Sequence, residues 1–244
     1  MGTANRTILR KVQKQTSRLA HEKKVNKPEP DNIPERYREP KFTVFEHVMS
    51  KEWMAELGKW LHSQRHYFKR SHEDGQIKHS YELSNVDELH QPTGYLKKII
   101  AEKLNEAIEK IDIPDFELEQ IECHATLYHH GSHFSWHKDN IDYNGEPAET
   151  RRLSYVLYLH ANPKMFSGGE LEFTDGTMVE PEHNKLVVFD PCQKHRVRRV
   201  ECWSADFLHG RWAIYGWIHG KTKRSLEDDL LKQKYDVYKA FEEA

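Results

Sequence analysis

The residues of this 244-residue sequence that are best suited to chemistry are a histidine and an aspartate two positions apart, His137 and Asp139. Side chains at positions i and i+2 of a β-strand point to the same face of a sheet, so this pair can reach into one interior. An imidazole nitrogen and a carboxylate oxygen both bind divalent transition metals. Such a triplet is common by chance, so its interpretation as two metal ligands needs further support.

A third ligand must come from a distant part of the chain, and His195 is the best candidate. It opens a strand-like stretch, 195–200, well downstream of the first two ligands. Two imidazoles and one carboxylate can occupy one face of an octahedral metal and leave the opposite face open, as in non-haem Fe(II) oxygenases. The pattern therefore favours oxidation chemistry at an Fe(II) centre.

An arginine begins a later strand whose alternate side chains share one side: Arg211, Ala213, Tyr215 and Trp217. A guanidinium group that faces an apolar interior is costly unless an anion meets it. Its paired N–H groups suit a carboxylate. Arg211 is therefore a candidate anchor for a carboxylate ligand. The alternative is an arginine at a strand end that pairs with an Asp or Glu of the chain.

The elements that must position these residues are mostly short strands. After Pro114 the hydrophobic pattern has a period of two, which predicts strands at 121–128, 153–159, 169–173, 185–189, 195–200 and 211–218. Many short strands separated by turn residues indicate a β-sandwich or barrel. Two helices are predicted before them, one after an N-cap at Ser50 and one from about Gly94 to Ile111. The fold class is therefore mainly β with flanking helices (α+β).

Composition shifts divide the chain into three parts. Residues 1–40 form a basic N-terminal arm followed by a proline-rich linker, residues 41–222 form the main domain with its β core at about 116–220, and residues 223–244 form a charged C-terminal helix. The arm is interpreted as a frayed helix or disordered tail, with a targeting or partner-binding segment as the alternative.

Bulk composition excludes several classes of protein. The sequence has no apolar run long enough to cross a membrane, and a net charge of −2 gives no general attraction to nucleic acid. Three cysteines without CxxC spacing argue against a disulfide framework and a thiolate zinc site, so an intracellular, reducing and cytoplasmic location is expected. The sequence leaves the oligomeric state open.

The stretch from Tyr128 to Trp217 resembles the prolyl 4-hydroxylase-like branch of the 2-oxoglutarate/Fe(II) oxygenases. The motifs that carry the resemblance follow the order they have in that family. They are Tyr128-x-x-Gly131, His137-x-Asp139, Arg152 to Leu159, Gly168-Gly-Glu-Leu171, Val179-x-Pro181, Leu186 to Phe189, His195-x-Val197-x-x-Val200, Gly210-Arg211 and Gly216-Trp217.

The resemblance implies a double-stranded β-helix core of the jelly-roll or cupin-like kind, which agrees with the many predicted strands. It implies that His137, Asp139 and His195 bind the iron and are the catalytic residues. Halogenating relatives have a small residue where this sequence has Asp139, so the carboxylate favours hydroxylation.

The resemblance also assigns residues to the cosubstrate. It implies that Arg211 binds the C5 carboxylate of 2-oxoglutarate and that Tyr128 and Tyr158 line the same pocket. Tyr128 is the stronger of the two because its neighbour Thr126 shares its face. Tyr215 is a further candidate, although many relatives have a smaller hydroxyl residue there.

Two departures from the family pattern are expected to be harmless. The spacing between His195 and Arg211 is long, which predicts an inserted loop at Cys202–His209. Asn184 replaces the glycine that usually precedes the Leu186 strand, and asparagine accepts the left-handed conformation that such a turn requires.

The implied activity is that of a dioxygenase that uses Fe(II), 2-oxoglutarate and O₂ to hydroxylate an unactivated C–H bond. The substrate would be a peptidyl proline or a small molecule, and the co-products would be succinate and CO₂. The alternative is a cupin-like metal-binding or sensing domain without turnover, which would have no need of Arg211. A β-sandwich interaction protein with an accidental His-x-Asp triplet is a third option.

Residues on the substrate side are less sharply indicated. Lys138, Arg152 and Trp217 are the candidates. If the basic residues near the ligands face the barrel mouth, an anionic substrate is favoured; alternatively, Arg196 and Arg198 lie on an outward strand face. The polar segments 72–91 and 140–150 are candidate lids.

Overall fold

A computed structural model describes residues 41–71, 78–84, 86, 91–141, 148 and 150–222. The basic arm and linker expected at residues 1–40 and the helix expected at residues 223–244 lie outside the described residues. So do residues 72–77, 85 and 87–90 of one candidate lid and residues 142–147 and 149 of the other.

The largest element is an eight-stranded antiparallel sheet that runs through the centre of the domain. Its order is β1 (Phe42–Glu46), β12 (Lys185–Phe189), β8 (Arg151–Leu159), β15 (Arg211–Thr222), β6 (His124–Tyr128), β4 (Tyr81–Leu83) and β2 (Lys69–Arg70), and β5 (Phe116–Ile121) also pairs with β15. Strands β1, β8 and β12 are rich in the β-branched and aromatic residues that suit a pleated, packed surface.

A five-stranded sheet packs against the inner face of the large sheet. Its order is β11 (Met178–Val179), β10 (Leu171–Phe173), β13 (His195–Val197), β7 (His133–His137) and β3 (Lys78–His79), and a separate pair consists of β14 (Val200–Cys202) and β9 (Phe166–Gly168). Buried side chains of both sheets, such as Phe173 and Phe189, meet between them. Two packed antiparallel sheets confirm the predicted fold class with its jelly-roll core.

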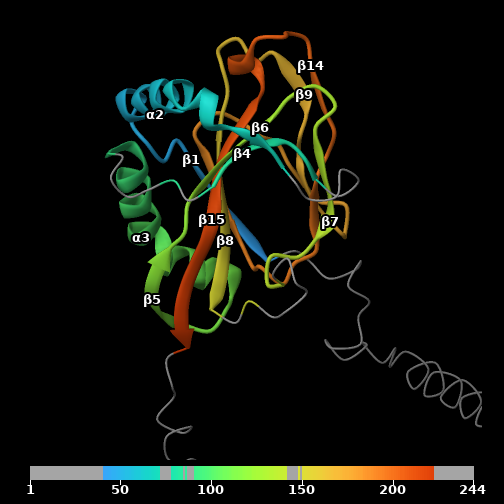
Figure 1. Ribbon diagram of the computed structural model, residues 1–244. Coiled ribbons are helices and arrows are strands. Elements are labelled where there is room, and N and C mark those ends of the chain that lie inside the picture. The colour runs from blue at the N-terminus through green and yellow to red at the C-terminus, as the bar shows by residue number, and fades with distance from the viewer. Residues whose placement is uncertain are drawn as a thin grey trace, which may run out of the picture. The chain divides into compact units, whose positions relative to one another are not determined.

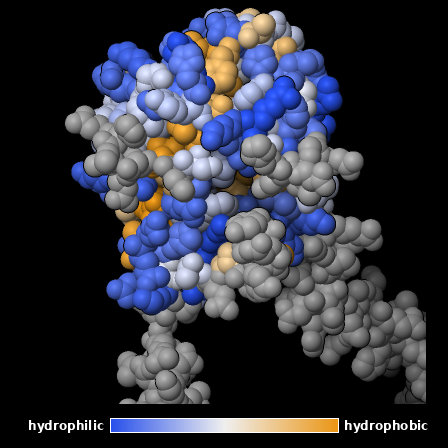
Figure 2. All heavy atoms as spheres, in the orientation of Figure 1, coloured by the Kyte–Doolittle hydropathy of each residue, from blue (hydrophilic) through white to orange (hydrophobic). Residues whose placement is uncertain are grey.

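The helices lie on the opposite, outer face of the large sheet. Helix α2 (Lys51–Ser63) starts at the predicted N-cap, where the Ser50 hydroxyl accepts a hydrogen bond from the N–H of Trp53, and α3 (Gln91–Ile111) follows later in the chain. Figure 1 shows both helices on one side of the large sheet and β7 on the other. Hydrophobic residues reach the surface in Figure 2 on the side where α2 and α3 lie.

Strand alternation separates an apolar outer face from a more polar inner face. On β8, Leu153, Tyr155 and Leu157 join the core formed with the helices. Tyr158 belongs to the core between the sheets instead. The inner face is therefore where the candidate functional side chains of β8 and β15 lie.

Several predicted boundaries were wrong. The strand predicted at 121–128 is only β6, because β5 ends at Ile121, and the strand predicted at 169–173 begins at Leu171. Helix α3 begins at Gln91 rather than about Gly94. The strand predicted at 195–200 is two strands, because the chain turns after Val197 and the N–H of Arg198 bonds to the carbonyl of Glu170. Val200 then pairs with Gly168 of β9.

The loop expected at Cys202–His209 joins β14 to β15 and contains a short 3₁₀ helix, η4 (Phe207–His209). A second one, η3 (Arg65–Tyr67), follows α2. In the part of the chain that the structure describes, no helix is both long enough and apolar enough to span a bilayer.

Asn184 has the left-handed conformation expected from the sequence, with φ of 64°. Its side chain also ties two distant segments together. The Oδ1 atom accepts a hydrogen bond from the N–H of Met49 at 3.0 Å, and the Nδ2 group donates to the carbonyl of Met49 at 2.7 Å. Asparagine therefore serves both the turn and the start of α2.

Substitution of Asn184 should separate these two roles. Asn184→Gly keeps the backbone conformation but loses both hydrogen bonds, so we expect the free energy of unfolding to fall by about 2 kcal/mol. Asn184→Ala should lose about 1 kcal/mol more because alanine resists positive φ. Urea denaturation measures both variants, and equal stability of the two would contradict the conformational role.

Candidate metal and cosubstrate site

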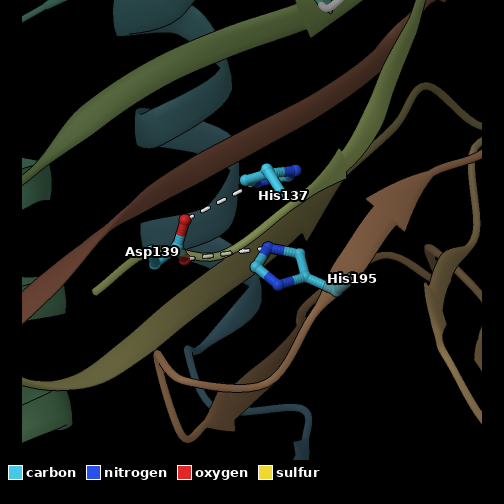
Figure 3. Close-up of side chains that lie close together, drawn as sticks. All are labelled: His137, Asp139 and His195. Carbon is cyan, nitrogen blue, oxygen red and sulfur yellow. Dashed lines mark ion pairs between the residues drawn. The ribbon is translucent and has the colours of Figure 1, made fainter. Parts of the chain in front are cut away.

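Three candidate ligands meet between the two sheets. His137 ends β7, His195 begins β13, and these two residues are direct partners in the sheet. The possible ligand atoms of His137, Asp139 and His195 all lie within 4.8 Å of one another. The Asp139 carboxylate lies between the imidazoles, with Oδ1 3.6 Å from Nε2 of His137 and Oδ2 3.7 Å from Nε2 of His195 (Figure 3).

The sequence predicted that His137 and Asp139 lie on the same strand, but the structure brings them together in another way. Strand β7 ends at His137, so Asp139 is not on a strand. It lies in a turn, where its N–H donates to the carbonyl of Pro191 at 2.9 Å. The register between β7 and β13 also shifts, so that His195 faces His137 while Val197 faces Phe134. This bulge brings Phe134 and His137, three positions apart, into contact inside the sandwich.

Each imidazole is fixed by its own backbone. Nδ1 of His137 lies 2.8 Å from the carbonyl of Ser135, and Nδ1 of His195 lies 2.8 Å from the carbonyl of Gln193. Because a carbonyl only accepts, Nδ1 carries the proton in both rings, and each Nε2 presents a lone pair toward Asp139. Phe134 also stacks on the ring of His137 with centroids 3.5 Å apart. Both histidines are therefore oriented as metal ligands require.

The protonation states also suit a divalent cation. Burial and the neighbouring His195 lower the pKa of His137 to about 3, which keeps its imidazole neutral near pH 7. Burial alone would raise the pKa of Asp139, but the two imidazoles and the Ser154 hydroxyl lower it below its ordinary value. That hydroxyl donates to Oδ2 of Asp139 at 2.7 Å. Two imidazole nitrogens and one carboxylate thus fit a metal with an open face.

Arg211 is fully buried on the inner face, with 2% of its surface exposed. Its Nε donates to the carbonyl of Gly169 at 2.6 Å, and its guanidinium carbon lies 4.9 Å and 4.8 Å from the ring centres of Tyr128 and Tyr158. No carboxylate of the described residues forms an ion pair with it, and the buried hydroxyl of Tyr158 beside it has no hydrogen-bond partner. A buried cation in this state fits an incoming carboxylate.

Tyr215 lies apart from this anchor. Its hydroxyl donates to Oε1 of Glu82 at 3.1 Å, and Glu82 also forms an ion pair with the buried Lys78. The ammonium group of Lys78 lies 4.7 Å from the ring centre of Phe134, on which His137 stacks. Burial would lower the pKa of Lys78, but Tyr215, Tyr128 and Glu82 raise it, so the lysine stays charged.

The Lys78–Glu82 pair joins the small sheet to the large one inside the sandwich, and sequence reasoning missed it. Both residues lie in the segment interpreted as a polar lid, where charged side chains are usually solvated. Only the tertiary arrangement shows that Lys78 is buried.

Trp217 lies on the metal side of the inner face, as its position on β15 indicated. The guanidinium of Arg151 is 3.5 Å from the centre of its ring, and Nη1 of Arg151 donates to the carbonyl of Asp139 at 2.8 Å. The indole N–H of Trp217 is buried and, among the described residues, has no hydrogen-bond partner. Arg151 thus belongs to this region, although it was not among the substrate-side candidates from the sequence.

The other basic residues lie elsewhere. Nε of Arg152 donates to the carbonyl of Gly220 at 2.8 Å, while Lys138 is half-buried in the turn before Asp139. Arg196 makes a two-pronged ion pair with Glu172, and Arg198 contacts the same sheet face through Glu170. The alternative that places Arg196 and Arg198 on an outward face is the correct one.

An acidic group held by two histidines lies close to Trp217. Glu122 Oε1 is 2.7 Å from Nε2 of His124, and its Oε2 is 3.0 Å from Nε2 of His219. The ring of His124 in turn contacts Trp217 edge-on, with centroids 5.6 Å apart. Burial would raise the pKa of Glu122, but these two partners lower it to about 2.

Removal of the Ser154 hydroxyl should weaken metal binding without loss of the fold. Ser154→Ala leaves Oδ2 of Asp139 without its hydrogen bond, so we expect affinity for Mn²⁺ to fall about tenfold. Titration calorimetry measures this, with Ser167→Ala, an exposed serine on β9, as the matched control. Unchanged affinity in Ser154→Ala would show that the hydroxyl does not orient the carboxylate.

Glu122 should make stability depend on pH in the acid range. Its folded pKa of about 2 lies below the ordinary 4.5, so its stabilising effect is complete above pH 4.5 and is lost as the pH falls toward 2. The loss should not exceed about 3 kcal/mol, since the group is partly exposed. Denaturation at several pH values should show a shallower slope in Glu122→Gln, and an equal slope would contradict this assignment.

Comparison with known proteins agrees with the interpretation of these residues as a metal site. Residues 123–219 match the 2OG-Fe(II) oxygenase superfamily. An uncharacterised PKHD-type hydroxylase of Synechocystis sp. is 30% identical over 139 residues, which cover 52% of this chain and 45% of that protein. The match thus spans less than half the length of this curated relative.

Solved structures of prolyl hydroxylases share the fold. A Pseudomonas putida prolyl-4-hydroxylase superposes with a TM-score of 0.57 at 19% identity, covering 75% of this chain and 94% of that one. A Trichoplax adhaerens prolyl hydroxylase in complex with a peptide fragment of hypoxia inducible factor gives 0.55 at 14% identity, with 74% and 84% covered. Residues 123–219 thus contain the part of the chain that is similar to the 2OG-Fe(II) oxygenase superfamily.

Proposed function

We propose that this protein is a 2-oxoglutarate- and Fe(II)-dependent dioxygenase that hydroxylates an unactivated C–H bond. The observation that carries the proposal is the buried guanidinium of Arg211, which has no carboxylate partner in the described part of the chain and lies on the same inner face as the metal side of the site. A domain that only bound a metal would have no use for this cation. No contact among the described residues favours the alternative of a metal-binding domain without turnover.

His137, Asp139 and His195 would hold the iron. The two Nε2 lone pairs and the carboxylate converge from three segments whose backbone is fixed by the hydrogen bonds to Ser135, Gln193 and Pro191. When bound, Fe(II) together with 2-oxoglutarate and O₂ supplies the oxidising power for hydroxylation, with succinate and CO₂ as co-products.

Arg211 would anchor the far carboxylate of 2-oxoglutarate. The buried hydroxyl of Tyr158 can donate a hydrogen bond to the same carboxylate, and Tyr128 contacts the guanidinium from another side. Between this anchor and Trp217 the inner face of β15 carries Ala213, the smallest side chain of the core between the sheets. Tyr215, whose hydroxyl bonds to Glu82, would shape the cavity rather than bind the cosubstrate.

The protein's other tasks are to place the target carbon and to exclude water. Trp217 and Arg151 lie beside Asp139, on the side away from Arg211, and are the candidates for contact with substrate. Asp139 occupies the position that a halide would need, so hydroxylation is expected rather than halogenation.

The substrate would be a peptidyl proline or a small molecule. Prolyl hydroxylases among the structural relatives, one of them in complex with a peptide, support the first class. An anionic group on the substrate would meet Arg151, since Arg196 and Arg198 are already paired with glutamates on the outward side of the five-stranded sheet. We place the activity in a reducing intracellular compartment, because all three cysteines are free thiols.

The first test is binding and turnover of 2-oxoglutarate. Wild-type protein with Fe(II) should form succinate, and Asp139→Ala should abolish both succinate formation and Mn²⁺ binding. Arg211→Met should leave Mn²⁺ binding intact but weaken 2-oxoglutarate binding to the Mn²⁺-loaded protein about 100-fold, because a buried charge pair is lost.

Arg198 lies on the outward side of the five-stranded sheet, so Arg198→Met is the control and should bind 2-oxoglutarate as the wild type does. A proline-containing peptide panel, compared with free amino acids, then separates the two substrate classes by stimulation of succinate release. Failure of the iron-loaded wild type to bind 2-oxoglutarate at all would end the oxygenase proposal.

A further inference from the structure

The ion pair between Lys78 and Glu82 lies inside the sandwich, next to the proposed metal site. Both side chains are shielded from solvent, with 6% of the Lys78 side chain and 18% of the Glu82 side chain exposed. A buried ion pair is seldom worth more to stability than apolar residues of the same volume, because each charge loses its hydration. The presence of this pair therefore indicates a role other than stability.

Lys78 reaches the metal site through one aromatic ring. Its ammonium group lies over the ring of Phe134, 4.7 Å from the ring centre, and the imidazole of His137 stacks on the same ring with centroids 3.5 Å apart and planes inclined by 17°. An ammonium group and a stacked imidazole cannot share one face of a ring, so Phe134 is held between them. The attraction of a cation to the face of an aromatic ring keeps this arrangement together.

The backbone alone holds Phe134 only weakly. The register between β7 and β13 shifts between His195 and Val197, next to Phe134, and such a bulge interrupts the ladder of hydrogen bonds. On the other side of β7, the strand that pairs Lys78 with Phe134 is β3, which has only two residues. Contacts of the side chain are therefore needed to keep the ring of Phe134 in place.

Glu82 anchors the ammonium group to the large sheet. It lies on β4, where it is the direct partner of Thr126 on β6. Its Oε1 atom also accepts a hydrogen bond from the hydroxyl of Tyr215 on β15 at 3.1 Å. Two further strands of the large sheet thus fix the carboxylate, and the carboxylate fixes Lys78. The ammonium group is therefore a fixed support for the ring of Phe134.

We propose that Lys78 is a positioning residue for the metal ligand His137. The pair with Glu82 holds the ammonium group, the ammonium group holds the ring of Phe134, and this ring sets the plane of the imidazole. The hydrogen bond from Nδ1 of His137 to the carbonyl of Ser135 fixes only one point of that imidazole, so the stacked ring decides the direction of the Nε2 lone pair. The inference rests on the proposed function, since it concerns a ligand of the proposed metal.

A second lysine–glutamate pair has the same form and serves as a matched control. The ammonium group of Lys164 is 2.8 Å from Oε1 of Glu182 and lies over the ring of Phe166, 5.1 Å from the ring centre. The imidazole of His160 contacts that ring edge-on, with centroids 6.1 Å apart. These residues are not ligands of the proposed metal, so loss of this pair should not affect metal binding.

The test removes both charges of each pair, because a single neutral substitution would leave a buried charge without its partner. Lys78→Met/Glu82→Gln should raise the dissociation constant for Mn²⁺ about tenfold, measured by titration calorimetry on the full chain without 2-oxoglutarate. Lys78→Arg keeps a cation that can lie over the ring and pair with Glu82, so its constant should stay within about threefold of the wild type. Lys164→Met/Glu182→Gln should leave the constant unchanged.

A thermodynamic cycle shows whether Lys78 acts through Phe134. Phe134→Leu removes the aromatic face and should itself raise the Mn²⁺ dissociation constant about tenfold. Combined with Lys78→Met/Glu82→Gln, it should raise the constant by less than about threefold more, because residues that act through one contact are not additive. A full tenfold further increase would show that the lysine acts by another route and would refute the proposal.

The visible absorption of bound Co²⁺ provides a readout that a change in stability would not move, because it depends on the directions of the ligands. The bands should shift in Lys78→Met/Glu82→Gln and in Phe134→Leu, but not in Lys164→Met/Glu182→Gln. Circular dichroism verifies that each variant is folded. Phe134→Leu covers the case in which the double variant does not fold, since unchanged bands in it would refute the role equally.

The outcomes separate this inference from the oxygenase proposal. Wild-type affinity for Mn²⁺ in Lys78→Met/Glu82→Gln would overturn the positioning role and leave the oxygenase proposal standing. A wild-type protein that binds no Mn²⁺ would contradict both.

Discussion

The direct pairing of His137 with His195 across β7 and β13 is the constraint on which the rest of the site depends. It fixes the separation of two imidazoles through backbone hydrogen bonds, which are the least adjustable part of a sheet. The bulge in β7 and the bond from Asp139 to Pro191 then bring in the carboxylate. The three donors are thus held by main chain, and side-chain contacts such as that of Ser154 only refine their orientation.

Two buried cations on the inner side of the sandwich show how unpaired charge can indicate function. Lys78 has a carboxylate partner in Glu82 and lies over the rings of Phe134 and Tyr215, so it is satisfied within the protein. Arg211 has only the carbonyl of Gly169 and two aromatic faces in the described structure. The same burial therefore has different implications: Lys78 forms a structural pair, and Arg211 is the anchor that we propose for a ligand.

The sequence was informative wherever the signal was local. Alternation predicted β8, β12 and β15 and placed Arg211 and Trp217 on one face, and asparagine at position 184 correctly indicated a left-handed turn. It failed where distant contacts decide. The turn at Asp139 and the split at Arg198 both depend on backbone bonds to remote carbonyls, and the Lys78–Glu82 pair depends on a strand crossing between sheets. No period in the sequence carries that information.

The two faces of the large sheet divide stability from chemistry. The outer face packs against α2 and α3 in a continuous apolar core, which supplies most of the hydrophobic stabilisation. The inner face carries Arg211, Ser154 and Tyr158, polar groups that a fold without a ligand would do better to replace with apolar ones. Because strand alternation keeps the two sets of side chains apart, the inner face can hold buried polar groups while the helix-packed core maintains the fold.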